Sequence, residues 1–264
     1  MRIVLTTRGR ASLSRQRTLG YLPESILRDL VVVCPEGETR FFTRNWPIAA
    51  AIPEPPDMRL SPKRRWVVTE LYRNEEAICL LDDDLEFATR RDDQPDKFKK
   101  ATHEQIEQRF AELAERITAD TPHAGFLPRQ AGHNEKFWEG GWHVGAYRAM
   151  YLLAYHVPTV LRDTDPFRVA TRSDFDMTLQ LLTRGHPFCM CYSFTIGQSG
   201  TQAKGGCSLY RTADMMRESA EFLAAQFPGL VALREKEYKG GGDVSKRTEI
   251  VVQWKRALEQ GAGR

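Results

Sequence analysis

Long apolar runs are missing from this sequence. The most apolar stretch, residues 144–160, is interrupted by Arg148 and His156. No segment therefore supplies the roughly 18 uninterrupted apolar residues that a membrane span requires. The first residues lead straight into a strand-like run at 2–7, without the apolar core and cleavage site of a signal peptide. These features predict neither a membrane protein nor a secreted one, and we expect a cytoplasmic location.

Paired cysteines are also missing. The chain has five cysteines in 264 residues, an odd number, and no two of them form a Cys-x-x-Cys pair. We therefore expect no disulfide framework, which suits a reducing compartment. Cys189 and Cys191 could form a metal or redox pair, but they lie in an alternating apolar run, which favours packing on one face of a strand.

A strong net charge is absent, yet the charge is unevenly distributed. The net charge is +3, and 41% of the residues are hydrophobic, which is enough for one large core. Residues 1–65 carry twelve Lys and Arg against six Asp and Glu, whereas residues 82–135 carry eight against thirteen. This pattern suits a site that holds an anion beside a cation, although solvated faces give the same tally.

Short apolar runs alternate with helix signals along the first third of the chain. The runs at 2–7, 30–34 and 77–81 are strand-like, and a mostly polar stretch at 13–28 can hold a helix. Further helices are predicted at 63–74, 102–117, 173–183 and 215–227, and a loop at 121–145. Short apolar strands separated by helices predict an α/β fold with a mainly parallel sheet covered on both faces.

Three adjacent aspartates carry the strongest chemical signal. Asp82, Asp83 and Asp84 directly follow the apolar run at 77–81. Ionised carboxylates at the end of a buried strand need a cation, or their pKa values rise. Asp82 and Asp84 would project to the same side, and oxygen ligands favour Mg²⁺ or Mn²⁺ over zinc. The carboxyl ends of strands are where open α/β sheets bind ligands. The alternative is a solvated acidic turn.

Two other interpretations of the aspartates fail on the neighbouring residues. A calcium-binding EF-hand loop that starts at Asp82 needs glycine at its sixth position, where Phe87 stands. A phosphatase of the Asp-x-Asp type needs Thr or Val where Glu86 stands.

The order of these elements resembles the GT-A glycosyltransferases. A strand, a helix, a second strand, a helix with basic residues and an apolar strand ending in Asp-x-Asp follow one another. The resemblance implies one domain over residues 1–264, with a GT-A-like, Rossmann-type mixed and mostly parallel sheet flanked by helices. Residues 1–90 would bind the nucleotide-sugar and residues 91–264 the acceptor. It also implies Mn²⁺ or Mg²⁺ at Asp82 and Asp84, bridging the diphosphate of a UDP-sugar donor.

The same resemblance implies which residues contact the donor. They are Thr6, Thr7, Arg8, Gly9, Arg10, Arg64, Asp82 and Asp83. Asp84 would be the more direct metal ligand, with Asp82 near the ribose or the sugar. Arg8 and Arg10 equally suit surface charges, and Arg64 equally suits a helix face that its aliphatic part covers.

A second match lies at residues 173–182, which read SDFDMTLQLL. They resemble the acidic segment that begins a helix beneath the acceptor site in this family. The resemblance implies that Asp174 is the general base, because an attacking hydroxyl needs a carboxylate within hydrogen-bond reach. Alternatively, Ser173 and Asp176 form a capping box and Asp174 complements the helix dipole. Both roles can coexist.

Four segments together resemble a narrower group, the TET/JBP-associated glycosyltransferases, many of them encoded by bacteriophages. These segments are Thr7-Arg8-Gly9-Arg10, LLDDDLEF at 80–87, residues 140–148 and SDFDMTLQLL. The resemblance spans most of the chain. It implies sugar transfer to 5-hydroxymethylcytosine in DNA, in the host cytoplasm if the protein comes from a phage. Many GT-A enzymes add a histidine near the C-terminus as a metal ligand, but the last histidine here is His186.

A DNA acceptor also suits several individual residues, some of them outside these segments. Basic side chains in or beside Gly-rich stretches can neutralise phosphate, and a tryptophan can stack on an extruded base. The expected acceptor-binding residues are Trp142, Asp176, Lys204, Lys246 and Arg247. Two alternatives stay open: a nucleotide-sugar transferase with a non-DNA acceptor, and a catalytically inactive nucleic-acid-binding domain on the same fold.

Overall fold

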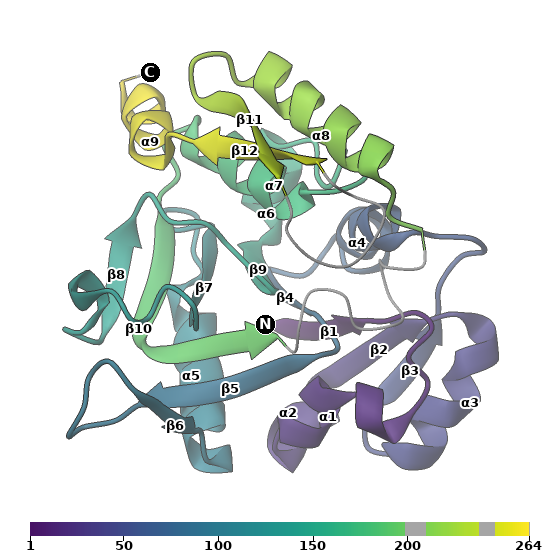
Figure 1. Ribbon diagram of the computed structural model, residues 1–264. Helices are drawn as coiled ribbons and strands as arrows, with labels where there is room; N and C mark the ends of the chain where they lie inside the picture. The colour runs from purple at the N-terminus through teal and green to yellow at the C-terminus, as the bar shows by residue number, and fades with distance from the viewer. Residues whose placement is uncertain (199–209, 238–245, 264) are drawn as a thin grey trace.

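In the described part of the chain, the main sheet has ten strands. The computed structural model describes residues 1–198, 210–237 and 246–263. The strand order is β3-β2-β1-β4-β9-β7-β10-β5-β6, and β8 pairs with β10 (Figure 1). The strands are β1 Arg2–Thr6, β2 Leu30–Cys34, β3 Ala50–Pro53, β4 Ala77–Leu81, β5 Leu85–Arg90, β6 Phe98–Lys100, β7 His123–Pro128, β8 Trp142–Gly145, β9 Leu152–His156 and β10 Phe188–Gln198.

The sheet is mixed, and most of its strands point the same way. Strands β3, β2, β1 and β4 are parallel neighbours, and β7 is parallel to β10. Strand β9 runs antiparallel to both β4 and β7, and β5 and β8 run antiparallel to β10. This confirms the predicted mixed, mostly parallel sheet with flanking helices.

Helices cover both faces of this sheet. They are α1 Arg17–Tyr21, α2 Glu24–Asp29, α3 Glu36–Asn45, α4 Leu60–Trp66, α5 His103–Arg116, α6 Val157–Asp163 and α7 Ser173–Leu182, with short helical turns at η1 Leu13–Arg15, η2 Val67–Leu71 and η3 Glu135–Phe137. Residues of α1, α2, α3 and α5 pack into one core with the sheet. Residues of η2, α6 and α7 form a second core with the opposite face.

An outer layer lies against α7. It consists of α8 Ala213–Gln226, the antiparallel strands β11 Val231–Glu237 and β12 Lys246–Val252, and α9 Trp254–Ala262. A third apolar cluster joins Leu179 and Leu182 of α7 to Leu223 of α8 and Ala257 of α9. Helix α7 is therefore packed on two sides, toward the main sheet and toward this outer layer (Figure 1).

Local signals explain most of the elements. Helix α5 begins at the predicted place, where Thr102 and Gln105 form a capping box. The helix expected at 13–28 is interrupted, because Pro23 ends α1 and begins α2. The loop expected at 121–145 was wrong in part: β7 and β8 lie there. Strand β7 is buried at every position, so it lacks the polar alternation that would have revealed it.

Two further expectations concern cysteines and membranes. Cys189 and Cys191 are buried side by side in the first core, which confirms core packing. Burial raises the pKa of both thiols. Among the described helices, none combines the length and the apolar character of a membrane-spanning segment.

Candidate functional site

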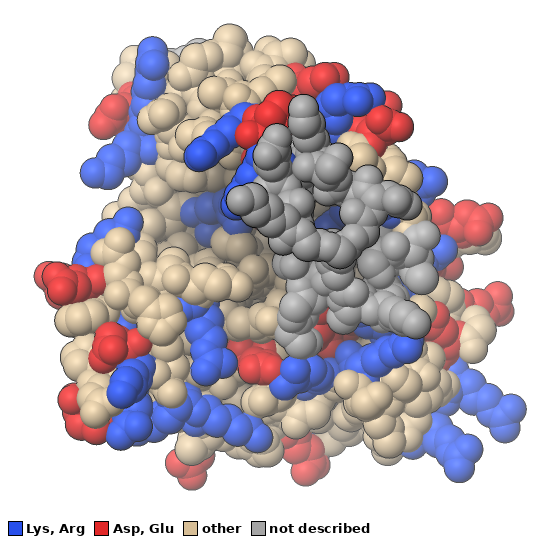
Figure 2. Space-filling model, in the orientation of Figure 1, with Lys and Arg blue, Asp and Glu red and all other residues tan. Residues whose placement is uncertain are grey.

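The site lies where β1 and β4 end side by side. In the parallel pairing of these strands, Leu5 lies opposite Leu81, so the residues that follow each strand meet at one edge of the sheet. Figure 2 shows this face of the molecule hollowed between its upper and lower parts, with basic atoms in the upper wall and acidic atoms at the lower rim. The loop after β1 thus faces the aspartates after β4, a contact between segments more than 70 residues apart.

Arg10 bridges two of the three aspartates. Its Nη1 lies 2.6 Å from Oδ1 of Asp83 and 2.9 Å from Oδ2 of Asp84. The hydroxyl of Thr7 donates a hydrogen bond to the other oxygen of Asp83. Both aspartates are buried. Burial raises the pKa of Asp83 to about 7, against the opposing effects of Arg10 and Thr7. The loop therefore supplies positive charge directly to the carboxylates.

Asp82 has different partners. It forms an ion pair with the buried Arg64 of α4, and Nε2 of Gln198, the last residue of β10, donates a 3.0 Å hydrogen bond to its Oδ2. Burial raises the pKa of Asp82, and Arg64 lowers it. The charges of Asp84 and Asp174 raise this pKa further. Asp82 is thus the carboxylate at which the N-terminal half and α7 converge.

Arg8 does not reach the aspartates in this structure. Its Nε lies 2.9 Å from Oε1 of Glu54, and the two side chains form an ion pair. Lys63, which is 2% exposed, pairs with the same carboxylate and donates a 2.7 Å hydrogen bond to the carbonyl of Thr7. Gly9 has φ +69°, a conformation that favours glycine. These contacts hold the backbone of the loop at residues 7–10 in place.

Asp174 lies in the first turn of α7 and is partly exposed. Nε of Arg148 is 3.8 Å from its Oδ2, and the Arg148 guanidinium lies 4.1 Å over the ring of Phe175. The charge of Asp174 contributes to the raised pKa values of Asp82 and Tyr151. The structure thus places the expected base, Asp174, in the same region as residues 82–85, which we call the aspartate turn.

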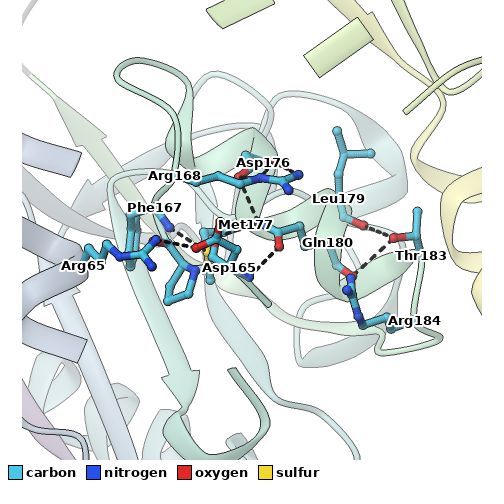
Figure 3. Close-up of polar contacts among 11 residues, drawn as sticks. Arg65, Asp165, Phe167, Arg168, Asp176, Met177, Leu179, Gln180, Thr183 and Arg184 are labelled. Atoms are coloured by element: carbon cyan, nitrogen blue, oxygen red, sulfur yellow. Dashed lines mark hydrogen bonds and ion pairs between the residues drawn. The ribbon is translucent and has the colours of Figure 1, made fainter. Parts of the chain in front are cut away.

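Asp176, which was expected to contact the acceptor, has a fully buried side chain. Nε of Arg168 lies 3.2 and 3.1 Å from its two oxygens, and Nε2 of Gln180 donates a 2.8 Å hydrogen bond to Oδ2 (Figure 3). Both oxygens are engaged by neighbours on the same segment of chain, which favours a structural role.

The other expected acceptor residues lie elsewhere or outside the described part. Nε1 of Trp142 donates a 2.7 Å hydrogen bond to Glu112 of α5, and its ring packs near Phe126. Lys204 lies outside the described residues. Lys246 and Arg247 belong to β12 by their backbone, but their side chains lie outside the described part.

Sequence reasoning missed Tyr151 and Gln198. The carbonyl of Tyr151 accepts a 3.1 Å hydrogen bond from the backbone N–H of Asp82. Tyr151 has φ +65°, which costs energy for a residue with a side chain and is common at functional sites. Gln198 ends a strand that pairs with β5 and so returns to the aspartates. No local pattern marks either residue, because both reach the site through strand pairing.

The aspartates leave one carboxylate oxygen that a cation could use. In the described part of the chain, no three His, Cys, Asp or Glu side chains are grouped to hold a metal. However, Oδ1 of Asp84 is buried and has no hydrogen-bond partner among the described residues. Mg²⁺ and Mn²⁺ are usually bound by one or two carboxylates, together with substrate phosphates and water. His186 is not poised as a further ligand, because its Nε2 lies 2.7 Å from Asp163.

Comparison with protein-family models gives one match. The model described as TET-Associated Glycosyltransferase matches residues 1–206, which include every described residue of the aspartate site. Comparison with curated protein sequences gives no match.

Solved structures with a similar fold include sugar transferases. The crystal structure of GalNAc-T7 with UDP, GalNAc and Mn²⁺ has a TM-score of 0.51 at 11% identity, covering 75% of this chain and 44% of that one. The chain thus spans less than half the length of that structure. The mannosyltransferase PcManGT from Pyrobaculum calidifontis, in complex with GDP-Man and Mn²⁺, has a TM-score of 0.49 at 13% identity, covering 98% of this chain and 68% of that one. At these identities the likeness concerns the fold.

Proposed function

Because the chain belongs to the TET-associated glycosyltransferase family, we propose that it transfers a sugar from a UDP-sugar to the hydroxyl of 5-hydroxymethylcytosine in DNA. One observation carries the proposal. The segment at 148–151 connects two carboxylates that are distant in the sequence: the carbonyl of Tyr151 accepts a 3.1 Å hydrogen bond from the N–H of Asp82, and Arg148 lies 3.8 Å from Asp174 in α7. A donor held at the first carboxylate would thus present its sugar near the second.

The donor half of the site combines opposite charges. The Nε atoms of Arg10 and Arg64 are buried and have no hydrogen-bond partner among the described residues, so each side chain has donor capacity left for a phosphate or a ribose. Asp82 and Asp84 would hold Mn²⁺ or Mg²⁺, which neutralises the charge that develops on a diphosphate leaving group. A nucleoside diphosphate matches this mixture, because it is an anion that commonly binds together with a divalent cation.

The acceptor half provides a base. The acceptor hydroxyl oxygen forms a bond to the anomeric carbon of the sugar, and the bond from that carbon to the diphosphate oxygen breaks. The hydroxyl proton passes to the carboxylate of Asp174. Nε of Arg148, 3.8 Å from Oδ2 of Asp174, would help to hold this carboxylate in place.

The DNA acceptor rests on the family resemblance and on the basic residues expected to contact it, Lys204, Lys246 and Arg247. A DNA-binding surface of this kind predicts affinity that falls steeply with salt concentration. A transferase acting on a small molecule or a protein predicts no retention on DNA.

The test is a transfer assay. The protein is incubated with Mn²⁺, a panel of UDP-sugars, and DNA with or without 5-hydroxymethylcytosine, and the nucleosides released by digestion are weighed by mass spectrometry. We expect the mass increment of one sugar on 5-hydroxymethylcytosine alone. The absence of an increment with every donor would overturn the DNA acceptor.

A matched pair of variants ties the activity to the site. Asp84→Asn removes the carboxylate with the unpartnered oxygen and should abolish transfer. Asp120→Asn makes the same change at an exposed residue before β7, at the opposite edge of the sheet. This control should transfer like the wild type. An active Asp84→Asn variant would favour the alternative in which the aspartates have no catalytic role.

A further inference from the structure

The aspartate turn is closed by a residue from another part of the chain. In an ordinary β-turn, the carbonyl of the first residue accepts a hydrogen bond from the N–H of the fourth. Here those two groups belong to Asp82 and Leu85, and both bond to the hydroxyl of Thr18 in α1 instead. Oγ1 of Thr18 donates to the Asp82 carbonyl at 2.6 Å and accepts from the Leu85 N–H at 2.8 Å.

Thr18 holds the middle of the turn as well. Its backbone N–H donates a 3.2 Å hydrogen bond to the carbonyl of Asp83. One residue thus engages three peptide groups of a four-residue turn, and it is completely buried. The hydroxyl thus links the two ends of the turn that carries the side chains of Asp83 and Asp84.

The same short segment also holds the loop after β1. Nε2 of Gln16, two residues before Thr18, donates hydrogen bonds of 3.1 Å to Oγ1 of Thr7 and 3.0 Å to the carbonyl of Arg10. Thr7 in turn donates to Asp83. Residues 16–18 therefore connect the arginine loop to the aspartate turn, so the cation-binding and anion-binding parts of the site share one support.

We infer that Thr18 is a positioning residue for the nucleotide diphosphate and its divalent cation, setting the geometry of the aspartate turn through its hydroxyl. The inference rests on the proposed function, whose donor site it deepens. Thr18 itself bonds to backbone groups of the turn and to none of its three carboxylates. Residues that orient metal ligands in this indirect way typically change metal affinity or activity by about 10- to 100-fold when replaced.

Thr18→Val is the decisive variant, because valine has nearly the same shape but neither donates nor accepts at Oγ1. The ends of the turn must then bond each other or remain unpaired, and either outcome displaces the aspartates. We expect affinity for UDP in the presence of Mn²⁺, measured by calorimetry, to fall about 10- to 100-fold. Thr18→Ser keeps the hydroxyl and should bind UDP in the presence of Mn²⁺ with the affinity of the wild type. In the transfer assay, the KM for the donor should rise.

Thr159→Val is the matched control. Thr159 is also completely buried, and its hydroxyl is 2.8 Å from Nδ1 of His156. His156 lies opposite Ala77, at the start of β4, so the control loses a partly buried hydrogen bond at the far edge of the sheet from the aspartates. We expect a lower Tm and unchanged affinity for UDP.

The outcomes separate the two proposals. A wild-type protein that does not bind UDP with Mn²⁺ overturns the proposed donor site, and this inference with it. A wild-type protein that binds, together with a Thr18→Val variant that binds equally well, overturns the inference alone. If Thr18→Val does not fold, Thr18→Ala tests the same hydroxyl without crowding the turn, and wild-type affinity in that variant is equally decisive against the inference.

Discussion

Asp174 and Asp176, two residues apart on α7, should respond in opposite ways to the same substitution. Asp174 is partly exposed, and its ion pair with Arg148 spans 3.8 Å. Asp176 is fully buried and bonded to Arg168 and Gln180. Replacement by asparagine keeps the shape of each side chain and removes its negative charge. We therefore expect Asp174→Asn to impair turnover and Asp176→Asn to impair stability.

The size of the first effect follows from the role of the base. A positioned general base contributes about 10²- to 10⁴-fold to a rate, so Asp174→Asn should lower kcat by about that factor. A carboxylate in the first turn of a helix contributes about 0.3–1 kcal/mol through the helix dipole. The stability loss of Asp174→Asn should therefore stay below about 1 kcal/mol.

The size of the second effect follows from burial. Weakening the partners of a buried charged group costs about 1–3 kcal/mol, and we take about 2 kcal/mol for Asp176→Asn because Arg168 keeps some contact with water. Unfolding entropy is about 2.1 cal/mol/K per residue, or about 0.55 kcal/mol/K for 264 residues. The Tm of Asp176→Asn should thus fall by about 4 °C, and that of Asp174→Asn by less than about 2 °C.

Two measurements check the pair: kcat in the transfer assay at saturating donor, and Tm by scanning calorimetry. Activity is measured well below the lowest Tm, so that unfolding does not mimic a catalytic defect. An Asp174→Asn variant with wild-type kcat would refute the assignment of the base. An Asp176→Asn variant that loses turnover at unchanged Tm would refute its structural role and return it to the acceptor site.

Two further predictions concern stability. Burial lowers the pKa of His123 from 6.5 to about 3. Between these pH values, His123 therefore binds a proton in the unfolded chain but not in the folded chain. The free energy of unfolding should fall between pH 6.5 and 3 by up to about 1.4 kcal/mol per pH unit. His123→Gln can still donate a hydrogen bond to the His186 carbonyl. In this variant the free energy of unfolding, measured by urea titration at several pH values, should depend less on pH. An unchanged pH dependence would contradict the assignment of this effect to His123. Lys63→Met removes a buried partner of Glu54 and should cost about 3 kcal/mol in urea unfolding; wild-type stability would show that Arg8 alone satisfies Glu54.

Much of the proposed donor site could be identified from the sequence, because local sequence patterns mark its residues. Asp82, Asp83 and Asp84 follow an apolar run, and the loop at 7–10 follows another. The ends of adjacent parallel strands meet at one edge of a sheet. These two segments meet because β1 and β4 are parallel neighbours in the sheet.

The sequence did not predict which groups each polar side chain contacts, because contacts in the folded structure decide this. The pattern SDFDMTLQLL does not distinguish the two aspartates of α7. Arg168, in the loop before α7, bonds to the buried Asp176, whereas Asp174 is partly exposed and lies near Arg148, which comes from a more distant segment. Arg8 and Arg10 likewise stand two positions apart in one loop, yet Glu54 engages the first and the aspartates engage the second.

The sequence by itself determined the alternation of strands and helices in the first third of the chain, the carboxylate-rich end of β4 and the acidic start of α7, because apolar periodicity and chain order are properties of neighbouring residues. Only the tertiary structure decided that Thr18, Tyr151 and Gln198 surround the aspartate turn. Each arrives by helix packing or strand pairing across the sheet. The free energy of a buried hydrogen bond depends on which groups meet in space, and spacing along the chain does not encode that meeting.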